Sequence, residues 1–238
     1  MSYSFLLQAD VNNAAEATAE KIGVKEVPIW DIIDQSNGGI GWVINLILLI
    51  MFGYSIFIFV ERYLALQKAS KGEKGLLNRV KAKINSGDIQ GAKDICAEAG
   101  NRDNPSARMI EKGIARLGKP LDNIATSIEN TGKLEVMRLE QRLSFLATAS
   151  GAGPMIGFFG TVVGMVVVFI DLQNAANLEL KIIAPGMMTA MVTTVEGLIV
   201  GIVSFMGYNH LAAKVGKIIY QMENTAIEFI DILHQPGK

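Results

Sequence analysis

Three long stretches without fixed charge decide what this 238-residue chain can fold into. Residues 40–60 and residues 143–170 contain no Asp, Glu, Lys or Arg, and residues 182–213 contain only Glu196. About 20 apolar residues are enough for one helix to cross a bilayer, so each stretch predicts one membrane span. The sequence therefore predicts an all-α membrane protein with three transmembrane helices, the second and third extending into a cytoplasmic helical domain.

The charges of the connecting loops predict the orientation of the chain. Residues 61–142 contain 16 Lys and Arg against 11 Asp and Glu, whereas residues 1–40 contain two Lys against six acidic residues. Loops rich in Lys and Arg stay on the cytoplasmic side of the membrane. We therefore expect the N-terminus in the periplasm, and the long loop and the C-terminus in the cytoplasm.

These spans fix the predicted boundaries. A periplasmic amphipathic segment covers residues 1–39, and the cytoplasmic helical domain covers residues 63–142. The three transmembrane helices cover residues 40–62, 143–171 and 182–212. A periplasmic loop at residues 172–181 joins the last two, and a cytoplasmic C-terminal helix covers residues 213–238.

Turn signals divide the cytoplasmic stretch into short helices. One is predicted at residues 76–84, a second after Asp88, and a third at Asn104, where a capping residue precedes Pro105. A further helix begins at Pro120 and could continue unbroken into the second span. Apolar residues at three- and four-residue spacing predict that the third span also continues as a helix, packed on the one that leads to the second span or on its copy in a neighbouring subunit.

Patterns typical of catalysis and metal binding are missing from the sequence. Histidine occurs only at positions 210 and 234, and Cys96 is the single cysteine. Zinc sites and disulfides need more residues of these kinds, at defined spacings. We therefore expect a protein that is not an enzyme, that needs no cofactor or metal, and that binds membrane lipid and protein partners but no nucleic acid.

Small residues recur at helical spacing in the second and third spans. Such stripes let helix backbones approach closely in lipid, where no hydrophobic force drives helices together. The two spans carry more stripes than we expect a three-helix subunit to bury, which favours an oligomer. The predicted helix-packing residues are Gly153, Gly157, Gly160, Gly164, Gly197 and Gly201.

Two motifs give the chain a resemblance to a known family. Residues 153–165 (GPMIGFFGTVVGM) and residues 184–198, with Ala184-Pro185-Gly186 followed by AMVTTVEGL, resemble the second- and third-span motifs of the MotA/TolQ/ExbB proton-channel family. The three spans and the long loop after the first are similar to the ExbB and TolQ branch, whereas MotA-type subunits have four spans.

The resemblance implies a bacterial inner-membrane subunit that assembles as a homopentamer around a central pore. That pore would hold the transmembrane helices of an ExbD- or TolR-like dimer, whose aspartate takes up the proton. Proton flow would drive a motion that is passed to a TonB- or TolA-like transducer. The ExbB-like role, which energises outer-membrane transport, is the leading expectation. A TolQ-like role in envelope maintenance, a gliding-motor stator and a passive membrane scaffold are the alternatives.

The same resemblance assigns candidate ion-pathway residues. Thr161 and Thr194 match the pore-facing threonines of the second and third spans, where their hydroxyls would orient water around the partner carboxylate. The alternative is that each threonine bonds a carbonyl of its own helix. Thr189 stands where many family members carry a glutamate. Thr193, which precedes Thr194, is a further candidate ion-pathway residue.

Glu196 lies two helical turns beyond Thr189. Seven residues at about 100° each return to within roughly 20° of the same helix face. A carboxylate at bilayer depth costs roughly 2.5 kcal/mol or more, so it marks an ion pathway or a buried contact. Glu196 could therefore serve the pore, a contact between subunits, or a structural hydrogen bond to a neighbouring helix.

Overall fold

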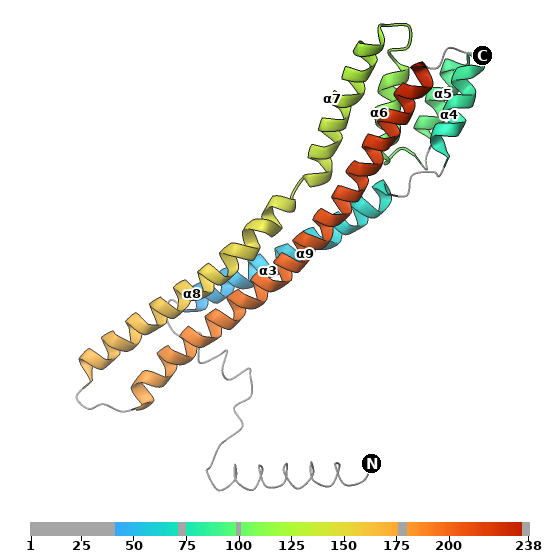
Figure 1. The fold of residues 1–238 in the computed structure, drawn as a ribbon. Helices are drawn as coiled ribbons and strands as arrows, with labels where there is room; N and C mark the ends of the chain where they lie inside the picture. The colour runs from blue at the N-terminus through green and yellow to red at the C-terminus, as the bar shows by residue number, and fades with distance from the viewer. Residues whose placement is uncertain (1–40, 71–74, 99–100, 176–179, 235–238) are drawn as a thin grey trace, which may run out of the picture.

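The computed structural model describes residues 41–70, 75–98, 101–175 and 180–234, and within these ranges every regular element is a helix (Figure 1). The predicted amphipathic segment at residues 1–39 lies outside the described residues, as do residues 176–179 of the predicted periplasmic loop. The loop is shorter than predicted, because residues 172–174 and 180–181 are helical. The helices, in chain order, are α3 (Gly41–Ala69), α4 (Leu76–Asn85), α5 (Ile89–Ala97), α6 (Pro105–Ile114), α7 (Leu121–Glu140), α8 (Leu143–Asn174) and α9 (Leu180–His234).

Three of these helices, α3, α8 and α9, are long and apolar enough to cross a membrane. This finding confirms the all-α membrane fold predicted from the uncharged stretches. Helix α3 continues to Ala69, beyond the expected end of the first span near residue 62. Its added turns bury Leu66 and Ala69 in the core of the adjoining helices, which explains why the helix does not stop at the first charges.

The helical domain consists of α4–α7, the end of α3, and α9 beyond Leu211. The predicted caps are present: Asp88 Oδ1 accepts from the N–H of Gly91 at 2.8 Å, and Asn104 Oδ1 accepts from that of Ser106 at 2.9 Å. Such caps satisfy N–H groups that the first turn of a helix leaves without a partner. The predicted starts of α5 and α6 are therefore confirmed.

Helix α9 runs unbroken for 55 residues and links the membrane span to the helical domain (Figure 1). Its expected apolar face is buried against α6 and α7 of the same chain. This packing confirms the predicted continuation of the third span. The fully or almost fully buried residues of this face are Leu211, Val215, Ile218, Met222 and Phe229.

The expectation of one continuous helix from Pro120 through the second span is wrong. The backbone breaks between α7 and α8 at Gln141 and Arg142, and Arg142 has a φ of 66°, in the left-handed region. In an unbroken helix the carbonyl of Arg138 would accept the N–H of residue 142. Instead, Arg62 Nη1 of α3 donates to this carbonyl at 3.5 Å, and Arg142 Nη1 pairs with Glu61 Oε2 at 2.5 Å. Contacts with α3 thus replace the missing helical bond.

Candidate functional site

Helices α8 and α9 approach so closely that backbone meets backbone at several points of their contact. A Cβ atom built on Gly157 would lie 2.8 Å from the carbonyl oxygen of Thr193, and one built on Gly197 would lie 2.5 Å from the carbonyl oxygen of Gly153. Real Cβ atoms do not approach backbone this closely, so only glycine allows the two helices to come together here. This contact, which we call the α8–α9 seam, confirms the close approach expected from the small-residue stripes.

The seam takes up the glycines that the sequence predicts to pack. All six predicted packing glycines are buried, and a Cβ on any of them would meet the opposite helix of the same chain. The expectation that one subunit would leave stripes unused is therefore wrong. It failed because α8 and α9 lie against each other over nearly their whole membrane length, so both stripes of α8 face α9 (Figure 1).

Thr193 is the most enclosed of the candidate pathway residues. Its side chain is fully buried and occupies the space left by Gly160. Its hydroxyl donates within α9, with the carbonyl oxygens of Thr189 and Ala190 at 3.1 and 3.0 Å. Thr189 is also buried, and its hydroxyl lies 3.0 Å from the carbonyl oxygen of Pro185. Within one subunit, both hydroxyls are used inside the protein.

Thr161 and Thr194 lie at the same edge of the seam. Thr194 Oγ1 is 3.2 Å from the carbonyl oxygen of Ala190 on its own helix and 3.4 Å from that of Gly157 on α8. Thr161 is one turn beyond Gly157 and donates to the carbonyl of Phe158 at 2.5 Å. Both threonines bond helix carbonyls, as the alternative interpretation expected, yet both remain partly exposed. Each hydroxyl oxygen can therefore still accept a hydrogen bond from water.

This edge of the seam faces away from α3. Ile156 and Val163 of α8 and Val200 of α9 pack with Ile44 and Leu48 of α3, and these contacts define the α3 side. At 100° per residue, Thr161 lies about 140° around α8 from Ile156, and Thr194 lies about 120° around α9 from Val200. The structure therefore places both threonines on the side opposite α3.

Glu196 is on a different side of α9. Two residues after Thr194, it is rotated by about 160° from that threonine and by only about 40° from Val200. It is half-buried and forms no hydrogen bond or ion pair with any residue that the structure describes. Glu196 thus lies on the same face of α9 as Thr189, as the spacing predicts, but the structure does not place it at the edge that holds Thr161 and Thr194.

A hydrogen bond between Ser55 and Ser204 was not anticipated from the sequence. Their hydroxyls are 3.1 Å apart, both side chains are buried, and the bond joins α3 to α9 within the apolar layer. Each serine is one of several polar residues in a mainly apolar run, so the sequence does not reveal which of them pair. In the described ranges no cluster of His, Cys, Asp and Glu could hold a metal ion.

Comparison with known proteins identifies the family of this chain. The sequence profile of the MotA/TolQ/ExbB proton channel family matches residues 101–224, which is more than half of the chain and includes the whole seam. The Tol-Pal system protein TolQ of Haemophilus influenzae is 40% identical over 101 residues, which cover 42% of this chain and 44% of that protein.

Two further relatives are similar at a lower identity. TolQ of Pseudomonas aeruginosa is 32% identical over 48% of this chain and 50% of its own length. The biopolymer transport protein ExbB of Salmonella typhimurium is 32% identical over 43% of this chain and 45% of its own length. The chain thus spans about half the length of these curated relatives.

Proposed function

Because this chain belongs to the MotA/TolQ/ExbB proton channel family, we propose that it is the pore-forming subunit of a proton-driven motor in the inner membrane. The observation that supports the proposal is that Thr161 and Thr194 lie at the same edge of the α8–α9 seam, each partly exposed. The chain is an inner-membrane protein by its family and its three apolar helices. Its pore role, its partners and the system that it serves are our proposals.

The threonine pair is suited to a water-filled pathway. A hydroxyl can donate and accept hydrogen bonds without adding a fixed charge, so it can orient water beside a carboxylate that gains and loses a proton. In our proposal this carboxylate belongs to an ExbD- or TolR-like partner with a single span, which enters the pore as a dimer. The chain itself then supplies the wall of the pathway, and the partner supplies the proton acceptor.

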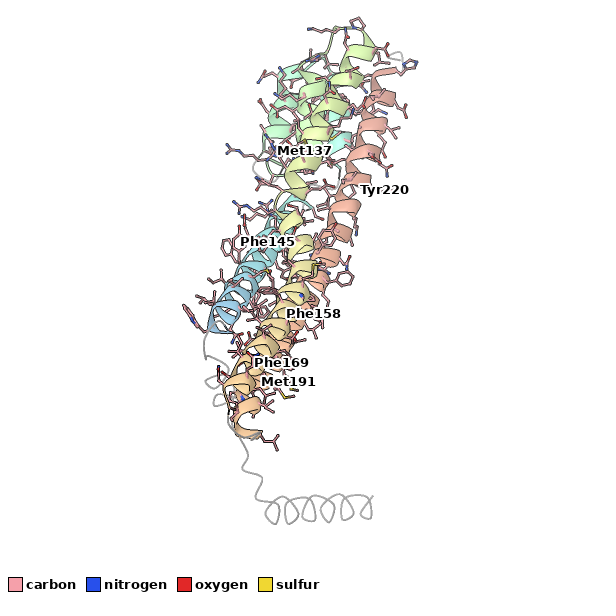
Figure 2. The ribbon with its side chains drawn as sticks, turned by 90° about the vertical axis from the view of Figure 1, so that its left-hand side faces the viewer. Met137, Phe145, Phe158, Phe169, Met191 and Tyr220 are labelled. Carbon is pink, nitrogen blue, oxygen red and sulfur yellow. The ribbon has the colours of Figure 1, made fainter. Side chains whose placement is uncertain are left out.

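The proposed assembly is a homopentamer with the threonine edge toward the axis. Helix α3 then lies on the lipid side, which agrees with its many exposed apolar residues, among them Leu49, Ile50 and Phe57. Figure 2 shows Phe158, Phe169 and Met191 on the outer surface of the α8–α9 pair, which is available for neighbouring subunits and for the partner helices. By the charge of the loops, the helical domain is cytoplasmic and the N-terminus periplasmic.

Two cellular roles are compatible with this mechanism. An ExbB-like subunit would energise a TonB-type transducer for outer-membrane transport, and a TolQ-like subunit would act through a TolA-like transducer in envelope maintenance. The 40% identity to a Tol-Pal protein supports the TolQ-like role as a candidate equal to the ExbB-like role. A gliding-motor stator would use the same pore with another output.

A deletion strain separates these roles. Loss of energy-dependent uptake of an iron chelate, restored by the wild-type gene, supports the ExbB-like role, whereas leakage of periplasmic proteins and sensitivity to detergent support the TolQ-like role. Thr161→Val and Thr194→Val should each fail to restore the lost phenotype. If both variants restore it fully, the pore role of the threonine pair is wrong.

A further inference from the structure

The helical domain exposes few large apolar side chains, and most of them lie on two helices. Among the described residues of α4–α7 and of α9 beyond Leu211, Ile89 is on α5, whereas Leu134 and Met137 are on α7 and Tyr220 and Ile227 are on α9. The four on α7 and α9 are each about 60–70% exposed. Exposed apolar side chains grouped in this way mark contact surfaces.

The exposed face of α9 is acidic as well as apolar. Tyr220 and Ile227 are seven residues apart and therefore lie on one side of the helix. Glu223, Glu228 and Asp231 are exposed on the same half of the helix, and no basic residue follows Lys217 in α9 except the terminal His234. We call this surface, formed by residues 220–231, the acidic face of α9.

A basic groove lies between α5, α6 and α7. It has a volume of about 450 Å³, and the exposed Leu134 forms part of its wall. Four basic side chains line it against two acidic ones, and one of the acids, Glu135, is already paired with two of the arginines. The basic residues are Arg102, Arg108, Lys112 and Arg138.

The two surfaces lie at the same height along the molecule. Phe229 of α9 and Ile128 of α7 meet at Gly113, where a built Cβ would lie 2.8 and 2.9 Å from them. From this level α7 and α9 run toward the membrane side by side (Figure 1). Met137 and Tyr220 are each nine residues closer to the membrane, which is about 14 Å at 1.5 Å per residue. Figure 2 shows them on different sides of the domain.

We propose that the acidic face of α9 in one subunit docks on the basic groove and on Met137 of the next subunit. The inference rests on the homo-oligomer of the proposed function and adds where the subunits touch outside the membrane. A closed ring relates neighbours by rotation alone, so two surfaces that meet must lie at equal height and on different flanks. These surfaces meet both conditions, and their charges are complementary, which fixes the orientation of the contact.

Disulfide cross-linking tests the contact directly. In a full-length Cys96→Ala background, a chain that carries both Met137→Cys and Tyr220→Cys should form disulfides between subunits on oxidation. A denaturing gel should then show a series of cross-linked oligomers up to the size of the closed ring. Either substitution alone should give no cross-link, because the contact joins two different surfaces. A matched pair of Ile89→Cys and Tyr220→Cys should also give none, since Ile89 lies outside both surfaces.

The outcomes separate this inference from the proposed function. A native mass spectrum that shows an intact oligomer without the 137–220 cross-link overturns the contact and leaves the pore proposal standing. Cross-linking by either single variant also overturns the proposed contact, because it would show that identical surfaces meet. Cross-linking of Tyr220→Cys to another protein overturns the proposed contact too. A spectrum with monomers only overturns both.

Charge reversal supplies a second test. Glu228 precedes Phe229 and Lys112 precedes Gly113, so the two charges lie at nearly the same height. Glu228→Lys should reduce the yield of the 137–220 cross-link several-fold, and Lys112→Glu in the same chain should restore it. Failure of the second change to restore the yield, with the oligomer intact, contradicts the proposed pairing of the surfaces.

Discussion

Thr194 Oγ1 lies 3.4 Å from the carbonyl oxygen of Gly157, so a hydroxyl of the third membrane helix reaches the backbone of the second. This approach depends on the absence of a side chain at Gly157, since a Cβ there would lie 3.2 Å from the Cα of Thr194. The glycine contact and the threonine pair are therefore one structural unit. Changes in packing along the α8–α9 seam should disturb the threonines as well.

Gly197→Ala should destabilise the protein by about 1–3 kcal/mol, because the added methyl group would press on the backbone of Gly153 and Gly157. Thermal unfolding in detergent should show the loss as a lower midpoint temperature. Gly151→Ala is the matched control, since Gly151 is in the same helix pair and a Cβ there meets nothing within 4 Å. Equal stability of the two variants would contradict the described seam.

A homopentamer is the expected assembly. Native mass spectrometry of the detergent-extracted protein should give a main species of five chains, with additional mass when a single-span partner is co-expressed. The excess of small residues no longer supports this expectation, because the seam within one chain uses them. The support that remains is the family and the exposed apolar surface of α8 and α9. A spectrum of monomers and dimers only would count decisively against the pentamer.

Glu196→Gln should retain assembly and most of the energised function. The side chain points about 160° away from Thr194, so we expect a contact role rather than proton passage. Glutamine keeps the shape and can donate and accept hydrogen bonds, whereas Glu196→Leu would leave any polar neighbour unpaired, at about 1–3 kcal/mol. If the Glu196→Gln variant assembles but is inactive in an uptake or envelope assay, Glu196 takes part in proton passage and the contact role is wrong.

Cys96 should react slowly with maleimide while the protein is folded. Burial, with a smaller effect of the nearby Glu111 carboxylate, raises the pKa of the Cys96 thiol from 9.0 to about 12. The thiolate is the reactive form, so reaction at pH 7–9 should require unfolding. Ile89→Cys in a Cys96→Ala background is the exposed control. Rapid labelling of Cys96 in the native state would show that α5 opens locally.

The same shift predicts how stability depends on pH. Between pH 9 and 12 the folded thiol keeps its proton and the unfolded thiol loses it, so the unfolded state binds fewer protons. The contribution of Cys96 to stability is thus present below pH 9 and is lost as pH rises toward 12. Cys96→Ala should remove this part of the alkaline decline, as measured by denaturant midpoints. An identical decline in both proteins would contradict the assignment.

Much of the fold could be predicted because its signals are local. Uncharged runs give the three spans, Asp88 and Asn104 give helix starts, and apolar spacing gives the buried face of α9. The break at Arg142 could not be predicted in this way. It depends on Glu61 and Arg62, which are about 80 residues away in the chain and meet the break only in the folded protein.

The sequence proposes the residues of the candidate site but not their arrangement. The motifs identify Thr161, Thr194 and Glu196, but they do not say which side of α9 is covered by α3. That side is fixed by contacts of Val200 with Ile44 and Leu48. Only with this packing known does it follow that the threonines share one edge of the seam while Glu196 lies on another side.

Proton flux through reconstituted vesicles tests the central claim most directly. The protein and its single-span partner are placed in liposomes with a pH-sensitive dye inside, and a proton gradient is applied. Thr161→Val combined with Thr194→Val should assemble normally and lower the flux at least tenfold. Thr148→Val, whose hydroxyl bonds the carbonyl of Ser144 on α8 away from the seam, should leave the flux unchanged. Full flux through the assembled double variant would contradict the assignment of the pathway to the threonine pair.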